Sequence, residues 1–397
     1  MRITYFADIR FPLERANGVQ TMETCHALAR RGHQVRLVVR PDSASPQRDP
    51  WTYYGLPPVP ALTIERVSVP ASPSLRRAAY VAHSLRRSMG RSCADVLLTR
   101  DLTIAGLLLR LPPPMRPPAV YESHGFAPAV SEDLPRMLST ASPPSPAKRS
   151  RLDARERRVW AGADGYITIT AALARELEGR FGSRPRLAVV PDGARLAAID
   201  DVGLRRDAGT EGPVVGYAGH LYPWKGPDVL LEAIAQLPGV RGLIVGGLAG
   251  EPDLDRLRAL AERLAPGRVT FVGQVDPPRV AGFLRQADVL VLPNTPGRVS
   301  AAYTSPLKLF EYMASGRPIV ASDLPALGEV LRPDVNAVLV EAGSAGALAA
   351  GLARVLGDAA LAARLAAQAR EDMRDWTWDK RAERIEALLE SVTGRRA

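Results

Sequence analysis

The segment Gly219–Gly226 combines features that suit the binding of a diphosphate group. A strand-like run, Val214–Tyr217, enters a loop opened by glycine, and Lys225 stands where the next helix is expected to begin. An ammonium group beside the partial positive charge of a helix N-terminus can neutralise a departing diphosphate. All but four of the 52 basic residues are arginines, so a lysine retained in such a loop is a candidate binding residue. The alternative is a solvated lysine in an ordinary loop.

A second segment, Tyr303–Gly316, carries a candidate ribose site. Ser305 suits a helix N-cap and Pro306 suits the first helical position, so backbone N–H groups are expected to be presented there. Lys308 and Glu311 are three residues apart and share one face of the expected helix. Glu311 also lies between apolar residues, and such a carboxylate can accept hydrogen bonds from two adjacent ribose hydroxyls. The alternative is a solvated carboxylate paired with Lys308.

Two more candidate segments lie in the first half of the chain. At Asn17-Gly18 a loop meets a helix start, where N–H groups and the helix dipole suit an anion and glycine permits the close approach of a phosphate. The run Val120–Glu122 leads into His124, which would face the ligand crevice beyond the strand and could hydrogen-bond a sugar hydroxyl or a phosphate. An ordinary helix start and a structural histidine are the respective alternatives. No G-x-G-x-x-G sequence follows the first strand, so the dinucleotide fingerprint is absent.

Alternating strands and helices must position these segments. The expected strands are Ile3–Ala7, Val35–Val39, Val96–Leu98, Ala119–Glu122, Gly165–Thr168, Leu187–Val190, Val214–Tyr217, Gly242–Val245, Val269–Val272, Val289–Leu292, Pro318–Ala321 and Ala337–Val340. Such alternation predicts parallel sheets with helices on both faces, which bind ligands beyond the carboxyl ends of their strands. We therefore expect an α/β protein with two Rossmann-like domains that face each other across a cleft.

The domain boundary is expected near the turn Pro191–Gly193, which precedes a polar stretch that runs to about Glu211. The first domain would be residues 1–194 and the second residues 195–374. The amphipathic tail, residues 375–397, is expected to pack back on the first domain. The Pro- and Ser-rich segments Pro41–Pro60 and Met137–Arg151 are expected to be loops.

The composition excludes several classes of protein. Apolar residues make up 46% of the chain and charged residues 24%, which is typical of a globular protein and excludes disordered and collagen-like chains. No run of about 18 uncharged apolar residues exists, so no membrane span is expected. The two cysteines and the absence of a signal-peptide pattern favour the cytoplasm. The net charge is +10, but the arginines are scattered without a basic–aromatic stripe, so we expect no nucleic-acid partner.

Four blocks follow one another in the second half: GHLYPWKG, FVGQVDPPRV, ADVLVLPN and SPLKLFEYMASGRPIVASDLPALGEVL. With these blocks the chain resembles the retaining glycosyltransferases of family 4, the glycogen-synthase-like type with the GT-B fold, over nearly all of its length. The resemblance implies that the C-terminal domain binds a nucleotide-diphosphate sugar and that the N-terminal domain binds the acceptor. It also implies transfer with retention of anomeric configuration, without a metal ion or another cofactor.

The resemblance assigns roles to individual residues. The donor diphosphate would contact Gly18, His220, Lys225, Ser305, Pro306 and Leu307; the ribose and base would contact Glu311, Gln274 and Val275; and the donor sugar would contact His124, Tyr303 and Thr304. His124, Lys225 and Glu311 would be the catalytic residues. Two positions depart from the family pattern, because Tyr303 replaces a glutamate that touches the donor sugar and His220 replaces an arginine. A histidine compensates phosphate charge less than a guanidinium does.

The expected function is transfer of a hexosyl group to an acceptor hydroxyl, with a β-phosphate oxygen as the base on the same face of the sugar. A UDP-sugar is favoured over a GDP- or ADP-sugar because it is the commoner donor in the family. The acceptor would be a sugar, a glycan or a lipid-linked molecule. Two alternatives are a pseudo-glycosyltransferase that binds nucleotide sugar without turnover, which Tyr303 and His220 support, and a nucleotide-sugar epimerase of the same architecture.

Contact with a membrane is a separate hypothesis. The pairs Arg76-Arg77 and Arg86-Arg87 flank the segment Ala78–Leu85, which as a helix could lie on an anionic surface. A lipid-linked acceptor would favour this interpretation and a peripheral location on the inner face of the membrane. A solvated helix face is the alternative.

Overall fold

The computed structural model of the chain describes residues 1–90, 93–137, 142–196 and 212–394. The chain forms two compact units. The first comprises Met1–Ser131, Pro144–Asp192 and Trp378–Ala397, and the second comprises Glu132–Pro143 and Gly193–Thr377. The polar stretch expected to join the domains lies largely outside the described residues.

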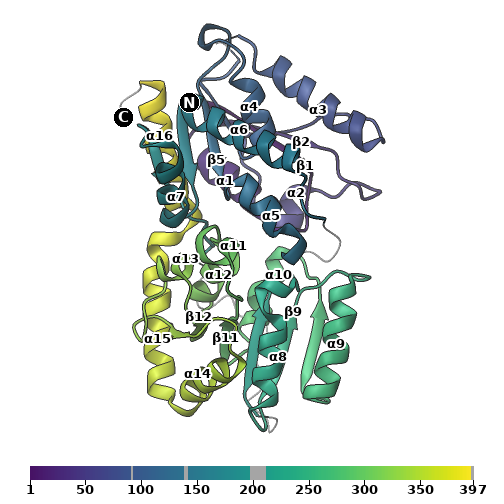
Figure 1. Cartoon of the computed structure of the whole chain (residues 1–397), viewed down its shortest axis with the longest axis vertical. Coiled ribbons are helices and arrows are strands. Elements are labelled where there is room, and N and C mark those ends of the chain that lie inside the picture. The colour runs from purple at the N-terminus through teal and green to yellow at the C-terminus, as the bar shows by residue number, and fades with distance from the viewer. Residues whose placement is uncertain (91–92, 138–141, 197–211, 395–397) are drawn as a thin grey trace. The chain divides into compact units, whose positions relative to one another are not determined.

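The first unit is built on a parallel sheet that includes β1, β2 and β5 (Figure 1). Its described strands run in the order β3-β2-β1-β4-β5-β6-β7. The strands are β1 (Arg2–Arg10), β2 (Gln34–Arg40), β3 (Leu62–Arg66), β4 (Val96–Thr99), β5 (Ala119–Ser123), β6 (Gly165–Thr168) and β7 (Leu187–Val189). The central strands β4, β5 and β6 are buried at every position, because helices cover both faces of the sheet. The strand order reverses between β1 and β4, so ligands are expected beyond the carboxyl ends of these two strands.

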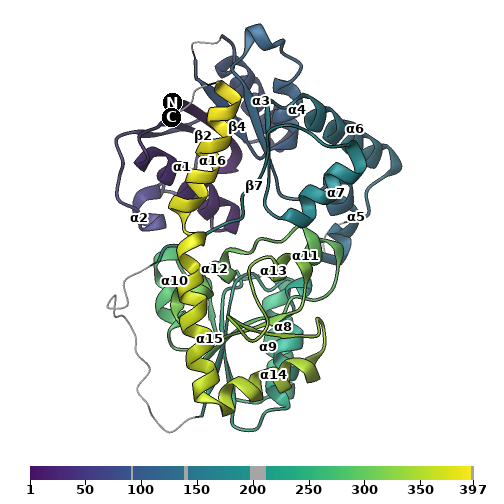
Figure 2. The same ribbon diagram turned by 90° about the vertical axis from the view of Figure 1, so that its left-hand side faces the viewer.

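The helices of the first unit are α1 (Ala16–Arg30), α2 (Pro50–Tyr54), α3 (Pro73–Arg87), α4 (Leu102–Leu108), η1 (Pro113–Met115), α6 (Pro146–Gly162), α7 (Ala171–Phe181) and α16 (Trp378–Thr393), and α5 (Ala127–Met137) begins in it. The C-terminal helix α16 lies beside α1 and also contacts β6 and β7 (Figure 2). The packing on β6 is tight, since a Cβ atom at Gly165 would lie 2.8 Å from Val392. An ion pair between Arg31 and Glu386 joins the same helices at their surface.

The second unit is built on a parallel sheet with the described strand order β10-β9-β8-β11-β12-β13. Its strands are β8 (Val214–Ala218), β9 (Arg241–Val245), β10 (Val269–Gly273), β11 (Val289–Leu292), β12 (Ile319–Ser322) and β13 (Val338–Val340). Side chains alternate between the two faces of a strand. In β8, Val215 and Tyr217 therefore belong to one buried cluster, and Val214 and Ala218 belong to the other. The order of strands reverses between β8 and β11, which places the expected crevice beside these two.

The helices of the second unit are η2 (Pro223–Lys225), α8 (Pro227–Ala235), α9 (Pro252–Leu264), α10 (Pro277–Leu284), α11 (Arg298–Ala302), α12 (Leu307–Ser315), α13 (Pro325–Gly328), α14 (Ala345–Gly357), α15 (Ala359–Asp372) and η3 (Met373–Trp376). Within the described ranges, no single helix is long and apolar enough to cross a membrane. Among the described residues, one pair of helices, α14 and Ala359–Trp376, has the length and apolar composition of a membrane span, but the two are bent by 100° at the break between them.

The predicted fold class, α/β with two Rossmann-like domains, is confirmed. The predicted loop over Met137–Arg151 is wrong in its second part, because α6 begins at Pro146. Ser145 caps this helix by accepting a hydrogen bond from the amide of Lys148, and proline occupies the first helical turn. A helix start was thus present in a segment whose proline and serine content suggested only a loop. The segment Pro41–Pro60 likewise contains the short helix α2, capped by Asp49.

Candidate functional site

The loop after β8 is held against the loop after β11. Gly226 has φ +73°, and a Cβ atom there would overlap the carbonyl oxygen of Pro293, so only glycine fits this contact. The amide of Thr295 donates a hydrogen bond of 3.1 Å to the carbonyl of Trp224. The two loops therefore form one structure at the point where the strand order of the second sheet reverses, and the predicted diphosphate segment lies there.

Lys225 ends the 3-10 helix η2 and stands just before the N-terminus of α8, as the sequence predicted. Its Nζ lies 4.3 Å from the centre of the Trp224 ring. Burial lowers the pKa of Lys225 to about 8, since an ammonium group loses hydration inside the protein. The group remains largely protonated at neutral pH. It therefore supplies a positive charge beside the amide groups that begin α8.

His220 lies in the same loop and is half-buried. Its ring stacks on Tyr222 with a centroid distance of 5.1 Å and an interplanar angle of 14°. Its carbonyl accepts a hydrogen bond of 2.6 Å from the hydroxyl of Tyr217. Both its ring and its backbone are thus fixed by neighbouring tyrosines. Its predicted contact with the diphosphate stays a prediction.

The start of α12 differs from the prediction by one residue. The N-cap is Pro306 rather than Ser305, and Leu307 is the first helical residue. Glu311 is half-buried. Lys308, the partner that the alternative gives to Glu311, is buried with 6% exposure, and their pairing stays a prediction. The Nζ of Lys308 lies 4.0 Å from the centre of the Tyr217 ring.

The remaining predicted donor residues of the second unit have unequal surroundings. Tyr303 is buried, and so is Thr304, whose hydroxyl donates a hydrogen bond of 2.8 Å to the carbonyl of Val299. That hydroxyl can still accept a hydrogen bond from a sugar, but its proton is already used. Gln274 is exposed after β10, whereas Val275 packs against the apolar cluster of the second unit. The structure thus gives Val275 a packing role, and its predicted contact with a nucleobase stays a prediction.

In the first unit, Gly18 lies inside the first turn of α1, which begins two residues earlier than the predicted junction of loop and helix. A Cβ atom at Gly18 would lie 2.5 Å from the carbonyl oxygen of Leu13 and 2.7 Å from the hydroxyl of Tyr54. That hydroxyl also bonds the backbone of Leu13. Close packing alone therefore requires glycine here, and its role toward a phosphate stays a prediction.

His124 belongs to a buried polar cluster at the carboxyl end of β5. Its Nε2 lies 2.7 Å from Oε1 of Glu122, and the same oxygen accepts hydrogen bonds of 2.6 Å from Gln20 and from Arg381. Gln20 in turn accepts a hydrogen bond of 2.8 Å from Arg100, which follows β4. The cluster therefore joins α1, β4, β5 and the C-terminal helix at the point where the order of the first sheet reverses.

The charges of this cluster fix the state of the histidine. Desolvation, and then the positive charge of Arg100, lower the pKa of His124 to about 4, although Glu122 acts in the opposite direction. Burial alone would raise the pKa of Glu122, but Arg381 and His124 outweigh it and hold that pKa well below its usual range. A neutral imidazole beside a carboxylate must donate from Nε2. The Nδ1 atom of His124 then carries the lone pair and can accept a hydrogen bond.

The chain is similar to known proteins over nearly all of its length. A family model described as "Glycosyl transferase 4-like domain" matches residues 17–193, and one described as "Glycosyl transferases group 1" matches residues 212–358. A D-inositol 3-phosphate glycosyltransferase of Xylanimonas cellulosilytica is 30% identical over 406 residues, which cover 95% of this chain and 92% of that protein. The chain belongs to the family 4 type of GT-B glycosyltransferases.

Another relative and two solved structures give the extent of the similarity. A D-inositol 3-phosphate glycosyltransferase of Nocardia farcinica is 33% identical over 70% of this chain, but the match spans only 61% of that protein. Sucrose-phosphate synthase from Thermosynechococcus elongatus covers 99% of both chains with a TM-score of 0.77 and 22% identity. Anabaena HepE in complex with UDP-glucose covers 98% of this chain and 100% of its own, with a TM-score of 0.71 and 19% identity. At these identities the two structures show the shared fold.

Sequence reasoning did not single out several buried polar residues beside the candidate site residues of this glycosyltransferase. Glu122 and Arg381 are almost completely buried, and so is Asn294, which follows β11. An acidic residue inside the buried strand β5 was an available signal, since a buried strand is otherwise apolar. Arg381 gave no such signal, because one arginine in an amphipathic helix resembles any other.

Gly18 and His124 belong to the first unit, whereas the other predicted site residues belong to the second. In the second unit the structure brings Lys225, His220 and Lys308 to one edge of the sheet. In the first unit Gln20 links α1, the helix of Gly18, to the cluster around His124. That the predicted residues of the first unit and those of the second unit belong to one site is a proposal. In the part of the chain that the structure describes, no group of three His, Cys, Asp or Glu side chains is placed to hold a metal ion.

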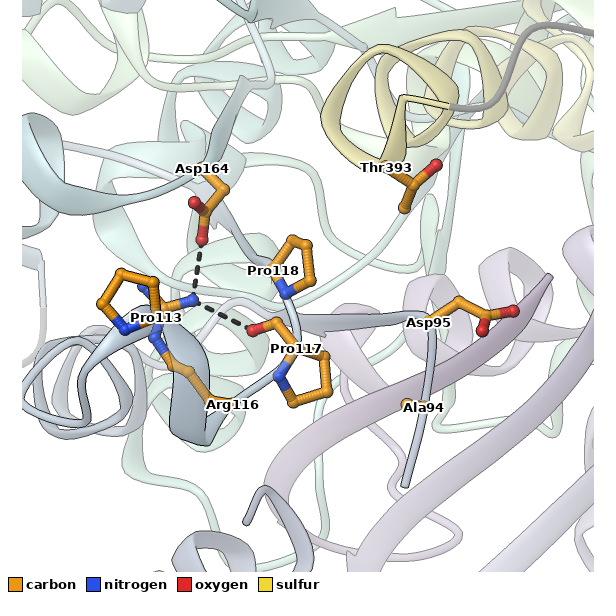
Figure 3. Close-up of a pocket in the computed structure, with 8 residues that line it drawn as sticks. All are labelled: Ala94, Asp95, Pro113, Arg116, Pro117, Pro118, Asp164 and Thr393. Atoms are coloured by element: carbon orange, nitrogen blue, oxygen red, sulfur yellow. Dashed lines mark hydrogen bonds and ion pairs between the residues drawn. The ribbon is translucent and has the colours of Figure 1, made fainter. Parts of the chain in front are cut away.

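A cavity of about 340 Å³ lies at the opposite edge of the first sheet, at the amino ends of β4, β5 and β6 (Figure 3). Arg116 lies in its wall and donates hydrogen bonds of 2.7 Å to Asp164 and 2.9 Å to the carbonyl of Pro117. Because ligands of open α/β sheets bind beyond the carboxyl ends, this cavity is separate from the candidate site.

Proposed function

We propose that the chain is a retaining glycosyltransferase that moves a hexosyl group from a nucleotide-diphosphate sugar to an acceptor hydroxyl. The observation that carries this proposal is the position of Lys225, beside the N-terminus of α8 at the reversal point of the second sheet. An ammonium group and helix amides at this point suit a diphosphate. Family membership makes the diphosphate of a nucleotide sugar the candidate ligand.

The reaction needs positioning and charge compensation more than a protein nucleophile. The bond between the anomeric carbon and the diphosphate oxygen breaks, and the electron pair leaves with the diphosphate. The acceptor oxygen bonds to the same face of the sugar, and its proton passes to an oxygen of the departing diphosphate. Lys225 stabilises the negative charge that develops there. With this source of positive charge, we propose that no metal ion is required.

Two further side chains have proposed positions toward the donor. Glu311, half-buried on α12, would accept hydrogen bonds from the ribose hydroxyls. His124 would use its free Nδ1 lone pair to accept a hydrogen bond from a hydroxyl of the transferred sugar. A neutral imidazole suits this role, because it adds no positive charge beside a sugar that becomes cationic in the transition state.

For the donor we propose a UDP-sugar, because HepE, with the same fold, was solved in complex with UDP-glucose. The acceptor is proposed as a hydroxyl of a sugar, a glycan or a lipid-linked molecule. Two relatives are named D-inositol 3-phosphate glycosyltransferases, and a Mycolicibacterium smegmatis relative is named a phosphatidyl-myo-inositol mannosyltransferase. Inositol 3-phosphate and phosphatidylinositol are therefore the first acceptors to test.

The test begins with a thermal-shift panel of UDP, GDP, ADP and their sugars, followed by transfer assays with and without EDTA. We expect UDP to give the largest shift and EDTA to leave the rate unchanged. Lys225→Met should abolish turnover and weaken UDP binding, while the exposed Lys148→Met serves as the matched control. Glu311→Gln should raise the KM for the donor. Binding without hydrolysis or transfer would favour the pseudo-glycosyltransferase instead.

Peripheral contact with a membrane is a second proposal. It rests on α3, where two of the four arginines are free of the ion pairs described next. Arg77 pairs with Asp8 and Asp101, and Arg87 pairs with Glu65, so these charges are already compensated within the first unit. The exposed Leu75 and Met89 remain available beside the other two arginines of the helix. Such a surface would lie on the cytoplasmic face, which we propose as the location because both cysteines are free thiols.

Co-sedimentation with vesicles tests this second proposal. The full chain should bind vesicles that contain anionic lipid more strongly than neutral ones, and Arg76→Gln with Arg86→Gln should remove the difference. Equal binding to both kinds of vesicle would dismiss the membrane surface without affecting the proposed transfer reaction.

A further inference from the structure

The second unit buries a cation, Lys308, whose ammonium group has no hydrogen-bond acceptor among the residues that the structure describes. Lys308 is 6% exposed. The ammonium lies over the face of the Tyr217 ring, with 4.0 Å between Nζ and the ring centre. Lysines are almost never fully buried unless they are paired, because an ammonium group loses its hydration. A missing anionic partner would explain this arrangement.

The charged groups around Lys308 come from two neighbouring elements. Burial first, and then the positive charge of Lys225, lower the pKa of Lys308 well below its usual value, while Glu311 on the same helix acts in the opposite direction. Tyr217 on β8 faces the ammonium with its own pKa raised by burial. The positive charge of Lys225 therefore opposes the protonation of Lys308. An anion placed near both would relieve their repulsion.

The position of Lys308 ties it to the predicted diphosphate loop. Its Cδ atom would lie 3.7 Å from a Cβ atom built on Gly219, the first residue of the loop that carries Lys225. Gly219 has φ +137°, a conformation that other residues rarely adopt, so the backbone there comes close to the lysine stem. Lys308 thus lies against the start of the loop, and Lys225 stands at its end.

Two more buried polar groups at this edge of the sheet lack partners among the described residues. They are both amide atoms of Asn294, which is 0% exposed, and Nε1 of Trp224. Asn294 follows β11, and Trp224 lies in the loop after β8, the strand beside it. Buried polar groups are normally hydrogen-bonded. All of these atoms except the Asn294 oxygen are donors, so a ligand rich in acceptor oxygens would satisfy them.

We propose that Lys308 is a second cation of the donor site and binds the diphosphate of the nucleotide sugar together with Lys225. The inference rests on the proposed function and adds a residue to it. Binding of the diphosphate strengthens the protonated form of Lys308, because it supplies the negative charge that the empty protein lacks. Nucleotide binding therefore takes up protons, and the uptake grows with the number of phosphates.

Calorimetry with the full chain tests this proposal. Binding of uridine, UMP and UDP is measured in two buffers of different ionisation enthalpy, across pH 7 to 9. The proteins are wild type, Lys308→Met and the exposed control Lys148→Met. We expect Lys308→Met to bind UDP about tenfold more weakly or worse, to bind uridine as wild type does, and to take up fewer protons with UDP.

A structural role alone would not change proton uptake or its dependence on phosphate number. If Lys308→Met binds UDP like wild type with the same uptake, the inference is wrong while the proposed function stands. If wild type binds none of UDP, GDP and ADP, the proposed function itself fails. Should another nucleoside diphosphate bind best, the same series is run with that nucleoside. Retained UDP affinity in Lys308→Met but lost binding of a carboxylate-bearing sugar nucleotide would place Lys308 on the sugar and overturn the diphosphate assignment.

Discussion

Each unit of the molecule buries a cation, and the two cations have opposite surroundings. Arg381 of α16 is 1% exposed at its side chain and donates hydrogen bonds to Glu122, to Thr24 and to two backbone carbonyls, with Asp192 3.8 Å away. Lys308 of α12 is also buried, yet its Nζ has no hydrogen-bond partner in the part of the chain that the structure describes.

The difference separates a structural charge from a binding charge. The guanidinium of Arg381 has three nitrogen atoms in a rigid planar arrangement. Each of these nitrogens donates a hydrogen bond to an oxygen atom of the first unit. That arrangement fixes Glu122, which in turn fixes the tautomer of His124. A buried ammonium without an acceptor lowers the stability of the empty protein, and a ligand can recover that cost. The first cation thus prepares the site, whereas the second is left for the ligand.

The largest expected effect comes from Arg381→Met. It leaves Glu122 buried without its cation, and removal of one partner of a buried ion pair typically costs about 3–5 kcal/mol. Urea unfolding should therefore show a large loss of stability in the first unit. The matched control on the same helix is Lys380→Met, which removes an exposed pair with Glu383 and should change stability by less than about 1 kcal/mol.

A double variant sharpens this prediction. Glu122→Gln in the Arg381→Met background removes the carboxylate that the first change left unpaired, so the double variant should be less unstable than the sum of the single ones. Additive losses would mean that the two groups stabilise the fold independently, and Arg381 would then lose its role in fixing Glu122.

The contrast between the two cations also explains what the sequence could predict. The loop that carries Lys225 was predictable, because its glycine, its lysine and the helix start are local in the chain. The strand of Glu122 was predictable for the same reason. The pair of Glu122 and Arg381 joins residues 259 positions apart, and no local pattern marks it.

Lys308 shows a second limit of sequence reasoning. Its spacing from Glu311 places both residues on one helix face, but helical periodicity alone could not show that Lys308 is buried. Packing of α12 against β8 decided the outcome, because the stem of Lys308 lies along Gly219 and its ammonium lies over Tyr217. The N-cap was misplaced by one residue for a smaller reason, since serine and proline both suit the first turn of a helix.

A medium effect is expected from pH on nucleotide binding. The pKa of Lys225 is lowered to about 8, so the ammonium is present below that pH and is lost as the pH rises through it. The affinity for UDP should therefore fall above pH 8, by up to about tenfold for each pH unit. Burial would lower the pKa of Arg381, but the carboxylates beside it outweigh burial and raise that pKa, so Arg381 should contribute nothing to the slope.

Lys225→Arg checks this assignment, because a guanidinium stays charged and should remove the part of the slope that belongs to Lys225, leaving the part that belongs to Lys308. Calorimetry from pH 7 to 9.5 measures the slope, and a thermal melt at each pH verifies that the protein stays folded. A slope that is unchanged in Lys225→Arg and absent in Lys308→Met would transfer the whole titration to Lys308 and leave Lys225 as a permanent cation.

The smallest expected effect is on the stability of the empty protein when Lys308 is replaced. Lys308→Met keeps the length of the stem and removes an ammonium that has no acceptor, so stability should be unchanged or higher by about 1 kcal/mol. The contact with Tyr217 is lost as a cation–π interaction but kept as an apolar one, which limits the gain. Urea unfolding without ligand measures this change beside that of Arg381→Met.

We expect Arg381→Met to lose much stability and Lys308→Met to lose none. A loss of several kcal/mol in Lys308→Met would mean that the protein itself compensates the ammonium, and both cations would then be structural. A small change in Lys308→Met together with a large one in Arg381→Met would show that burial alone does not decide the role of a charge. What decides the role is the number of hydrogen-bond acceptors that the folded protein places around the cation. At Lys308 we propose that a bound anion supplies them.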